Sequence, residues 1–198
     1  MSKLDNVRKI IANKVATPIV KVLAKTPLTP NALTWIGFLV TAAATALIVT
    51  ENLFVAGVAV LVAGFFDMLD GALARSTGRV TKFGAILDSS LDRICEALVL
   101  LGLLVIFARE QDITGSVLAG VTLLGSFMVS YIRARMEGMG VTCKAGFFTR
   151  PERVIVMALG LLLSRFEGAI IIALGITTLF SFITVVERLV YAWRQVKE

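Results

Sequence analysis

The sequence contains no histidine, only two cysteines and only four prolines in 198 residues. Without histidine, acid–base catalysis and metal binding by an imidazole are excluded. Cys95 and Cys143 lie far apart, fit no metal-ligand spacing, and are both expected near the cytoplasmic side, so we expect no disulfide. Charged residues are scarce too, at 17%, against 57% hydrophobic residues and a mean hydropathy of +0.87. This composition is typical of a polytopic membrane protein.

Six apolar segments have about the length that a helix needs to cross a bilayer. They lie at roughly 31–50, 53–74, 84–107, 113–133, 151–166 and 168–190. Before them, residues 3–25 mix six lysines and arginines with apolar residues, which predicts an amphipathic helix on an anionic membrane surface. Residues Met1–Asn6 show no signal-peptide pattern. We therefore predict one all-α membrane domain over 1–198, with an amphipathic juxtamembrane segment over 1–30 and a six-helix bundle over 31–190.

The basic residues predict the orientation of this bundle. Six spans place both termini and the 75–82 and 133–153 regions on one side, and all lysines and arginines except Arg109 and Arg165 belong to that side. Because basic residues mark the cytoplasmic side, both termini are predicted to be cytoplasmic, in a multi-pass protein of the plasma (cytoplasmic) membrane. We expect the protein to be surrounded by membrane lipid and to bind no nucleic acid.

Four aspartates lie near the cytoplasmic ends of the second and third segments. Asp67 and Asp70 are spaced i,i+3, and Asp88 and Asp92 are spaced i,i+4, so each pair shares one helix face. The two helices are predicted to be antiparallel neighbours, which lets the four carboxylates converge. Close carboxylates at membrane depth repel one another and attract cations. Oxygen ligands favour Mg²⁺, Mn²⁺ or Ca²⁺, and two such ions can clamp a diphosphate.

Two other interpretations of the aspartates are weighed against this one. They can form buried salt bridges with basic residues, the candidates being Arg75, Arg79, Arg93, Arg133 and Arg153. They can also line the ion or proton pathway of a transporter. Neither alternative explains why glycine and alanine occupy fixed positions between the aspartates.

The spacing of these residues resembles that of the CDP-alcohol phosphotransferases, whose signature is D-x2-D-G-x2-A-R-x8-G-x3-D-x3-D. The chain matches every fixed position, with Asp67, Asp70, Gly71, Ala74, Arg75, Gly84, Asp88 and Asp92. The resemblance extends over nearly the whole chain, including the basic first segment and a Thr-Pro-Asn sequence before the first span. It implies a metal-dependent transferase that uses a CDP-activated lipid, and a homodimer.

The resemblance also implies a role for each matched residue. Asp67, Asp70 and Asp88 would bind two Mg²⁺ or Mn²⁺ ions, with Asp88 shared between them. Asp92 would take the proton from the acceptor hydroxyl while lying near one metal. The cytidine and its phosphate would lie against Gly71, Ala74 and Arg75, and we assign Asp70, Asn31, Thr34 and Thr81 to the same CDP-lipid site.

The acceptor is inferred from residues outside the signature. Ser89-Ser90-Leu91 between the last two aspartates, the stretch from Ser130 to Glu137, and the sequence Thr149–Arg153 are similar to the branch of the family that uses an inositol phosphate. In that branch three basic residues bind the acceptor phosphate, and Arg133, Arg153 and Arg188 match them, with Arg194 as a second choice for the last. Arg153 lies 14 residues from Glu167, roughly 21 Å along a helix, so it is expected inside the bilayer and needs an anion.

The sequence thus predicts transfer of a phosphatidyl group from CDP-diacylglycerol, or the corresponding group from CDP-archaeol, to inositol phosphate, with release of CMP. The alternatives are glycerol 3-phosphate as the acceptor and, from another class, a cation transporter. Ordinary membrane topology remains an explanation for the arginines, in particular for Arg135, Arg150 and Arg194.

Overall fold

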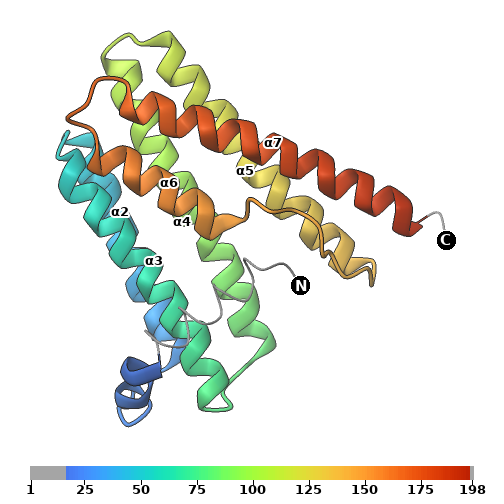
Figure 1. Ribbon diagram of the computed structural model, residues 1–198. Coiled ribbons are helices and arrows are strands. Elements are labelled where there is room, and N and C mark those ends of the chain that lie inside the picture. Colours follow the sequence, from blue (N-terminus) through green and yellow to red (C-terminus); the bar gives the residue numbers. More distant parts are fainter. Residues whose placement is uncertain (1–16, 197–198) are drawn as a thin grey trace.

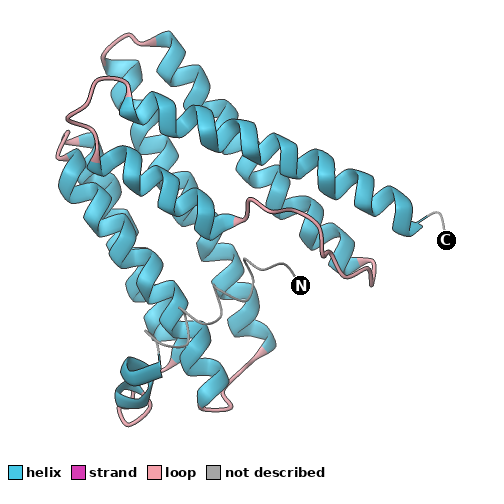
Figure 2. Ribbon diagram, viewed as in Figure 1, coloured by secondary structure: helices cyan, strands magenta, loops and turns pink. Residues whose placement is uncertain are grey.

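The computed structural model describes residues 17–196, and every regular element in that part of the chain is an α-helix (Figures 1 and 2). A short helix at 17–23 precedes six long ones: α2 (Pro30–Val49), α3 (Leu53–Ser76), α4 (Lys82–Arg109), α5 (Ile113–Gly138), α6 (Arg150–Leu162) and α7 (Ala169–Val196). The all-α prediction is confirmed for these residues. The predicted amphipathic helix over 3–25 lies mostly outside the described residues.

The six long helices pack as a closed ring. α2 packs on α3 and α4, α3 packs on α6, α4 packs on α5, and both α5 and α6 pack on α7. The main core draws residues from all six long helices and lies around the fully buried Ile48, Leu103, Leu161 and Leu174. α3 and α4 share few direct contacts, because each of them packs on α2 instead. α3 and α4 are therefore neighbours that are not closely packed on each other, and their aspartates still converge as predicted.

Threonines start three of the helices at the end of the bundle that carries the aspartates. The Thr29 hydroxyl accepts a hydrogen bond from the Ala32 amide at the start of α2, and Thr81 accepts one from Gly84 at the start of α4. Thr149 and Glu152 form a capping box at the start of α6. Such caps satisfy amide groups that a helix leaves unpaired. They fix where α2, α4 and α6 begin, and so where the side chains of their first turns lie.

Four of the described helices, α2, α3, α5 and α7, are long and apolar enough to span a membrane. Large apolar side chains on their outer faces are exposed, for example Leu39, Leu61, Leu124 and Leu179, as expected of surfaces that face lipid. The predicted fifth span, 151–166, is corrected. α6 has 13 residues, about 20 Å at 1.5 Å per residue, and ends at Leu162 before a turn that includes Gly168 at φ +77°.

Candidate active site

Three of the four predicted aspartates lie together at one end of the bundle. Carboxylate oxygens of Asp67 and Asp70 on α3 and of Asp88 on α4 lie within 4.8 Å of one another. Asp70 is buried, with 3% of its surface exposed, while Asp67 and Asp88 are partly exposed. Three oxygen ligands at this spacing, open to solvent on one side, fit a hard divalent cation such as Mg²⁺ or Mn²⁺. The spacing of the aspartates in the sequence predicted this cluster.

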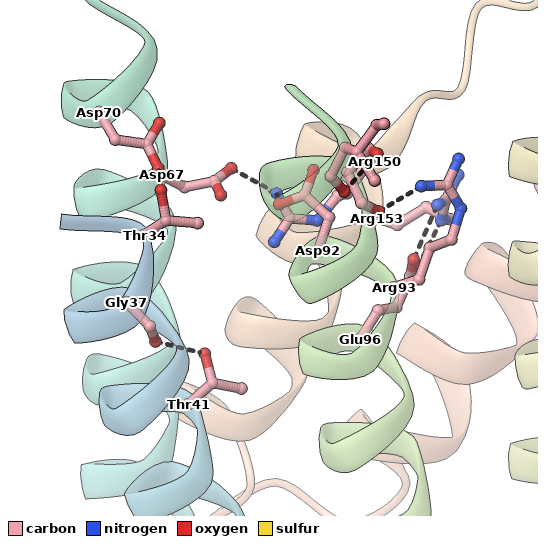
Figure 3. Close-up of polar contacts among 12 residues, drawn as sticks. Thr34, Gly37, Thr41, Asp67, Asp70, Asp92, Arg93, Glu96, Arg150 and Arg153 are labelled. Atoms are coloured by element: carbon pink, nitrogen blue, oxygen red, sulfur yellow. Dashed lines mark hydrogen bonds and ion pairs between the residues drawn. The ribbon is translucent and has the colours of Figure 1, made fainter. Parts of the chain in front are cut away.

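The orientation of Asp70 is set by α2. The Thr34 hydroxyl donates a hydrogen bond to Asp70 Oδ2 at 2.6 Å, and Thr34 itself is buried (Figure 3). Thr34 is predicted to contact the CDP-lipid, and in this structure its hydroxyl contacts a carboxylate of the aspartate cluster. Such a second layer of hydrogen bonds holds a ligand in the rotamer that a metal requires.

Asp92 lies next to the cluster and meets an arginine that sequence reasoning did not single out. Nη1 of Arg150, at the start of α6, contacts Asp92 Oδ1 at 2.6 Å and also contacts Asp67 Oδ2 (Figure 3). One cation therefore joins the predicted base to a predicted metal ligand. Among the described residues, none of the five arginines considered as salt-bridge partners for the aspartates forms such a bridge. Ordinary membrane topology was one explanation left open for Arg150. Its i,i+3 spacing from Arg153, which places both on one face of α6, is the signal that the sequence offers.

A second carboxylate–arginine pair lies one helical turn further along the same helices. Arg153 Nε and Nη2 donate to Glu96 Oε1 and Oε2 at 2.5 and 2.8 Å, and the side chains are 1% and 10% exposed. Glu96 was also missed, although it continues the i,i+4 series of Asp88 and Asp92 on α4. The anion that Arg153 was predicted to need is thus already supplied by the protein.

These groups line one central pocket between α2, α3, α4 and α6, which is partly open to solvent. Its charged lining residues are Asp67, Asp92, Glu96, Arg150 and Arg153. Its remaining wall is mostly apolar and includes Phe38, Val60, Leu100 and Met157. The cavity therefore connects the aspartate end of the bundle with the buried arginine, and it can admit a polar molecule next to Asp92.

The residues predicted to contact the nucleotide lie around the α3–α4 connection. The exposed Arg75 folds its guanidinium over Gly71, where an added Cβ would lie 3.2 Å from Nη1. At Gly84 an added Cβ would lie 2.9 Å from the Thr81 hydroxyl and 3.1 Å from Asn31 Oδ1. Two glycines of the signature thus leave room for close approach of neighbouring polar groups. Ala74 lies half-buried next to Arg75.

The three arginines predicted to hold the acceptor phosphate are not equivalent. Arg153 lines the central cavity, whereas Arg133 and Arg188 are not among the described residues that line it. Arg133 is exposed and pairs with Glu137 at 2.8 Å. Arg188 is buried, and its guanidinium donates to the carbonyls of Val129 and Ala145, the latter at 3.1 Å. Arg188 nevertheless lies close enough to Arg133 and Arg153 for their positive charges to act on it.

Comparison with known proteins agrees with this geometry. A family model described as CDP-alcohol phosphatidyltransferase matches residues 27–187. Archaetidylinositol phosphate synthase of Pyrococcus horikoshii is 39% identical over 94% of this chain and 97% of its own length. Phosphatidylinositol phosphate synthase of Mycobacterium tuberculosis is 36% identical over 98% of this chain and 92% of its own.

Solved structures of the Mycobacterium tuberculosis enzyme share the fold. One with CDP-DAG bound has a TM-score of 0.82 and 35% identity, covering 91% of this chain and 94% of that chain. Another, in complex with manganese and citrate, has a TM-score of 0.80 and 35% identity, covering 90% of this chain and 88% of that chain. The resemblance carried by the aspartate signature is thereby confirmed, and the chain belongs to the CDP-alcohol phosphatidyltransferase family of enzymes.

Proposed function

We propose that this enzyme transfers the phosphatidyl group of CDP-diacylglycerol, or the equivalent group of CDP-archaeol, to inositol phosphate and releases CMP. The observation that carries the proposal is the cavity that joins the aspartate cluster and Asp92 to the buried Arg153. Near-complete alignment with an archaetidylinositol and a phosphatidylinositol phosphate synthase supports this acceptor.

Asp67, Asp70 and Asp88 would hold the divalent cations, two Mg²⁺ or Mn²⁺ ions in this proposal. When bound, these ions neutralise negative charge on the diphosphate and so favour its cleavage. Thr34 keeps Asp70 in position for this task. The manganese in a related structure supports the assignment of a metal to this cluster.

Asp92 is the proposed general base. Its carboxylate accepts the proton of the acceptor hydroxyl as the hydroxyl oxygen attacks the lipid-side phosphorus, and the bond from that phosphorus to CMP breaks. Arg150 contacts Asp92 and Asp67 together, so it fixes the base relative to the cation cluster. Holding the two reactants in line supplies much of the rate enhancement in such a transfer.

The CDP-lipid is proposed to lie over the α3–α4 connection. Gly71 and Ala74 offer a surface without bulky side chains, and Arg75 offers a cation for the nucleotide phosphate. Asp70, Asn31, Thr34 and Thr81 border the same region, although the Thr34 and Thr81 hydroxyls are already used by Asp70 and Gly84. Backbone groups and Arg75 are therefore left with the larger share of nucleotide contacts.

The acceptor phosphate is assigned to Arg153, with Arg133 and Arg188 supplying positive charge from α5 and α7. A phosphate monoester carries nearly two negative charges, and arginine binds its oxygens with directed, charge-assisted hydrogen bonds. Free inositol lacks this group and is expected to be a poor acceptor.

We further propose that the chain is one membrane domain with six spans, forms a homodimer, and places both termini and the active site on the cytoplasmic side. The 75–82 and 133–153 regions next to the residues of the site are rich in lysine and arginine, which supports this orientation. Length and composition support membrane spans for α2, α3, α5 and α7. For α4 and α6 the proposed spans rest on their position in the bundle.

The test is a CMP-release assay with purified enzyme, CDP-diacylglycerol and a panel of acceptors. Inositol phosphate is expected to release CMP much faster than inositol or glycerol 3-phosphate. A preference for glycerol 3-phosphate would transfer the assignment to phosphatidylglycerol phosphate synthesis. Metal-dependent ion flux without CMP release would support a transporter instead.

A further inference from the structure

The Glu96–Arg153 pair has a geometry that ion pairing alone does not explain. Arg153 uses Nε and Nη2, which lie on one edge of the guanidinium, to bind both oxygens of Glu96. Nη1 lies on the other edge, is buried, and has no hydrogen-bond partner among the described residues. A buried donor without a partner is rare in folded proteins and is costly. An acceptor oxygen from another molecule would satisfy it.

The position of the pair indicates which molecule that is. Glu96 lies one helical turn beyond Asp92 on the same face of α4, and both line the central cavity with Arg153 (Figure 3). A molecule that contacts Arg153 Nη1 in this cavity therefore lies next to the proposed base. In the proposed reaction that molecule is the acceptor, and its phosphate carries the oxygens.

Glu96 also changes what Arg153 contributes. Because the carboxylate neutralises the guanidinium, the pair offers a directed hydrogen bond rather than a free charge. The two-bond contact fixes the plane of the guanidinium, so Nη1 keeps one direction before the acceptor arrives. A flexible arginine would lose conformational freedom on binding, whereas this one is already ordered.

We propose that Glu96 is a positioning residue for the acceptor: it holds Arg153 so that Nη1 is presented to the acceptor phosphate. This inference rests on the proposed function. Glu96 acts through Arg153 and is not itself required to touch the substrate. The shorter carboxylate of aspartate keeps the charge but cannot reach both nitrogens from the same backbone position.

The experiment compares Glu96→Asp and Glu96→Gln with wild type, and Glu110→Asp serves as the control on the same helix. Glu110 is exposed at the far end of α4, outside the cavity. Initial rates are measured with inositol phosphate varied at saturating CDP-diacylglycerol and Mn²⁺. They are then measured with CDP-diacylglycerol varied at saturating inositol phosphate and Mn²⁺. Both Glu96 variants are expected to raise the KM for inositol phosphate roughly tenfold to a hundredfold. The KM for the CDP-lipid and the kcat should change less than threefold, and Glu110→Asp should match wild type.

A double mutant distinguishes positioning from general damage. In an Arg153→Ala background, Glu96→Asp should raise the acceptor KM no further, because the group that it positions is gone. Equal effects of Glu96→Asp in both backgrounds would overturn the proposal. A lower acceptor KM in Glu96→Gln would overturn it too. That result would mean that the negative charge of Glu96 only weakens phosphate binding. A lower melting temperature with an unchanged acceptor KM would likewise reduce the pair to a structural contact.

Failure of the proposed function gives a different result. Wild type would then not use inositol phosphate at all. The acceptor that it does use would take the place of inositol phosphate next to Arg153, and the same KM comparison would be made with that acceptor. If the Glu96 variants raise the KM for that other acceptor, the positioning role stands; if they leave it unchanged, the positioning role is wrong.

Discussion

Two arginines one helical turn apart on α6 meet carboxylates in one cavity, and they do so in different ways. Arg150 has a side chain 19% exposed, and a single nitrogen touches both Asp67 and Asp92. Arg153 has a side chain 1% exposed, and two nitrogens bind the two oxygens of Glu96. Arg150 is therefore shared between two carboxylates and is partly exposed to solvent. Arg153 binds a single carboxylate and is buried.

The difference indicates which contact can change during the reaction. Separating the buried pair would leave an uncompensated charge in the protein interior, so Arg153 and Glu96 are expected to stay together. Asp67 belongs to the oxygen cluster that fits a metal, so a bound cation would compete with Arg150 for the Asp67 carboxylate. The cavity therefore has an exchangeable end near the aspartates and a fixed end near Arg153.

The largest expected effect comes from the exchangeable end. Asp88→Asn removes a ligand from the trio but keeps the side-chain volume, so Mn²⁺ binding and turnover should both be lost while the protein still inserts and purifies. Mn²⁺ binding is measured by titration and turnover by CMP release. The same loss is expected for wild type in excess EDTA. Full activity with EDTA present would contradict a metal-dependent reaction.

Removing the fixed arginine should act on one substrate only. Arg153→Ala deletes the proposed phosphate contact, so kcat/KM for inositol phosphate should fall roughly tenfold to over a hundredfold, with little change in the KM for the CDP-lipid. Arg135→Ala, an exposed arginine at the end of α5, is the control for lost positive charge. An unchanged acceptor KM in Arg153→Ala would remove Arg153 from the acceptor site.

The sequence predicted the features of the site that depend on one helix at a time. The i,i+3 and i,i+4 spacings place Asp67 with Asp70 and Asp88 with Asp92, and the structure brings the first three together. The helix count and the all-α class likewise follow from local hydropathy. Helix boundaries depend on more than hydropathy: α6 ends four residues before the predicted limit, because Ser164–Gly168 turn toward α7 rather than extend the helix.

The missed residues depend on which helices pack together. Arg150 reaches Asp67 because α6 packs on α3, and it also reaches Asp92 on α4; periodicity within α6 cannot reveal either contact. Glu96 could have been included, since it continues the acidic series of α4, but its pairing with Arg153 again requires the tertiary arrangement. Arg188 was predicted as a phosphate ligand, yet its guanidinium contacts two backbone carbonyls, and nothing in the sequence marks that use.

A smaller effect is expected from the hydrogen bond that orients the exchangeable end. Thr34→Val keeps the shape of the side chain and removes the donor to the buried Asp70, so Mn²⁺ affinity should fall about tenfold, as is usual for a residue that supports a metal ligand. Thr41→Val is the matched control, because the Thr41 hydroxyl donates to the Gly37 carbonyl within α2 (Figure 3). Equal Mn²⁺ affinity in the two variants would show that Thr34 does not support the metal site.

The smallest expected effect, and the one of opposite sign, comes from Arg150→Met. Methionine keeps a long side chain but removes the cation that contacts Asp67 and Asp92. Mn²⁺ should then bind roughly fivefold more tightly, since a unit charge at 4 Å contributes about 1 kcal/mol even in water. The metal-free protein should melt at a lower temperature, because the carboxylates lose their counter-charge. Titration with Mn²⁺ and thermal melts with and without it measure both changes.

Arg93→Met separates this local exchange from a general loss of positive charge. Arg93 follows Asp92 on α4, but its guanidinium contacts the Ser89 carbonyl rather than an aspartate. That variant should leave Mn²⁺ affinity within about twofold of wild type, because a charge without direct contact is better screened. If Arg150→Met lowers the melting temperature equally with and without Mn²⁺ and leaves Mn²⁺ affinity unchanged, Arg150 is a permanent structural contact. Both arginines would then be fixed, and the contrast between the two ends of the cavity would disappear.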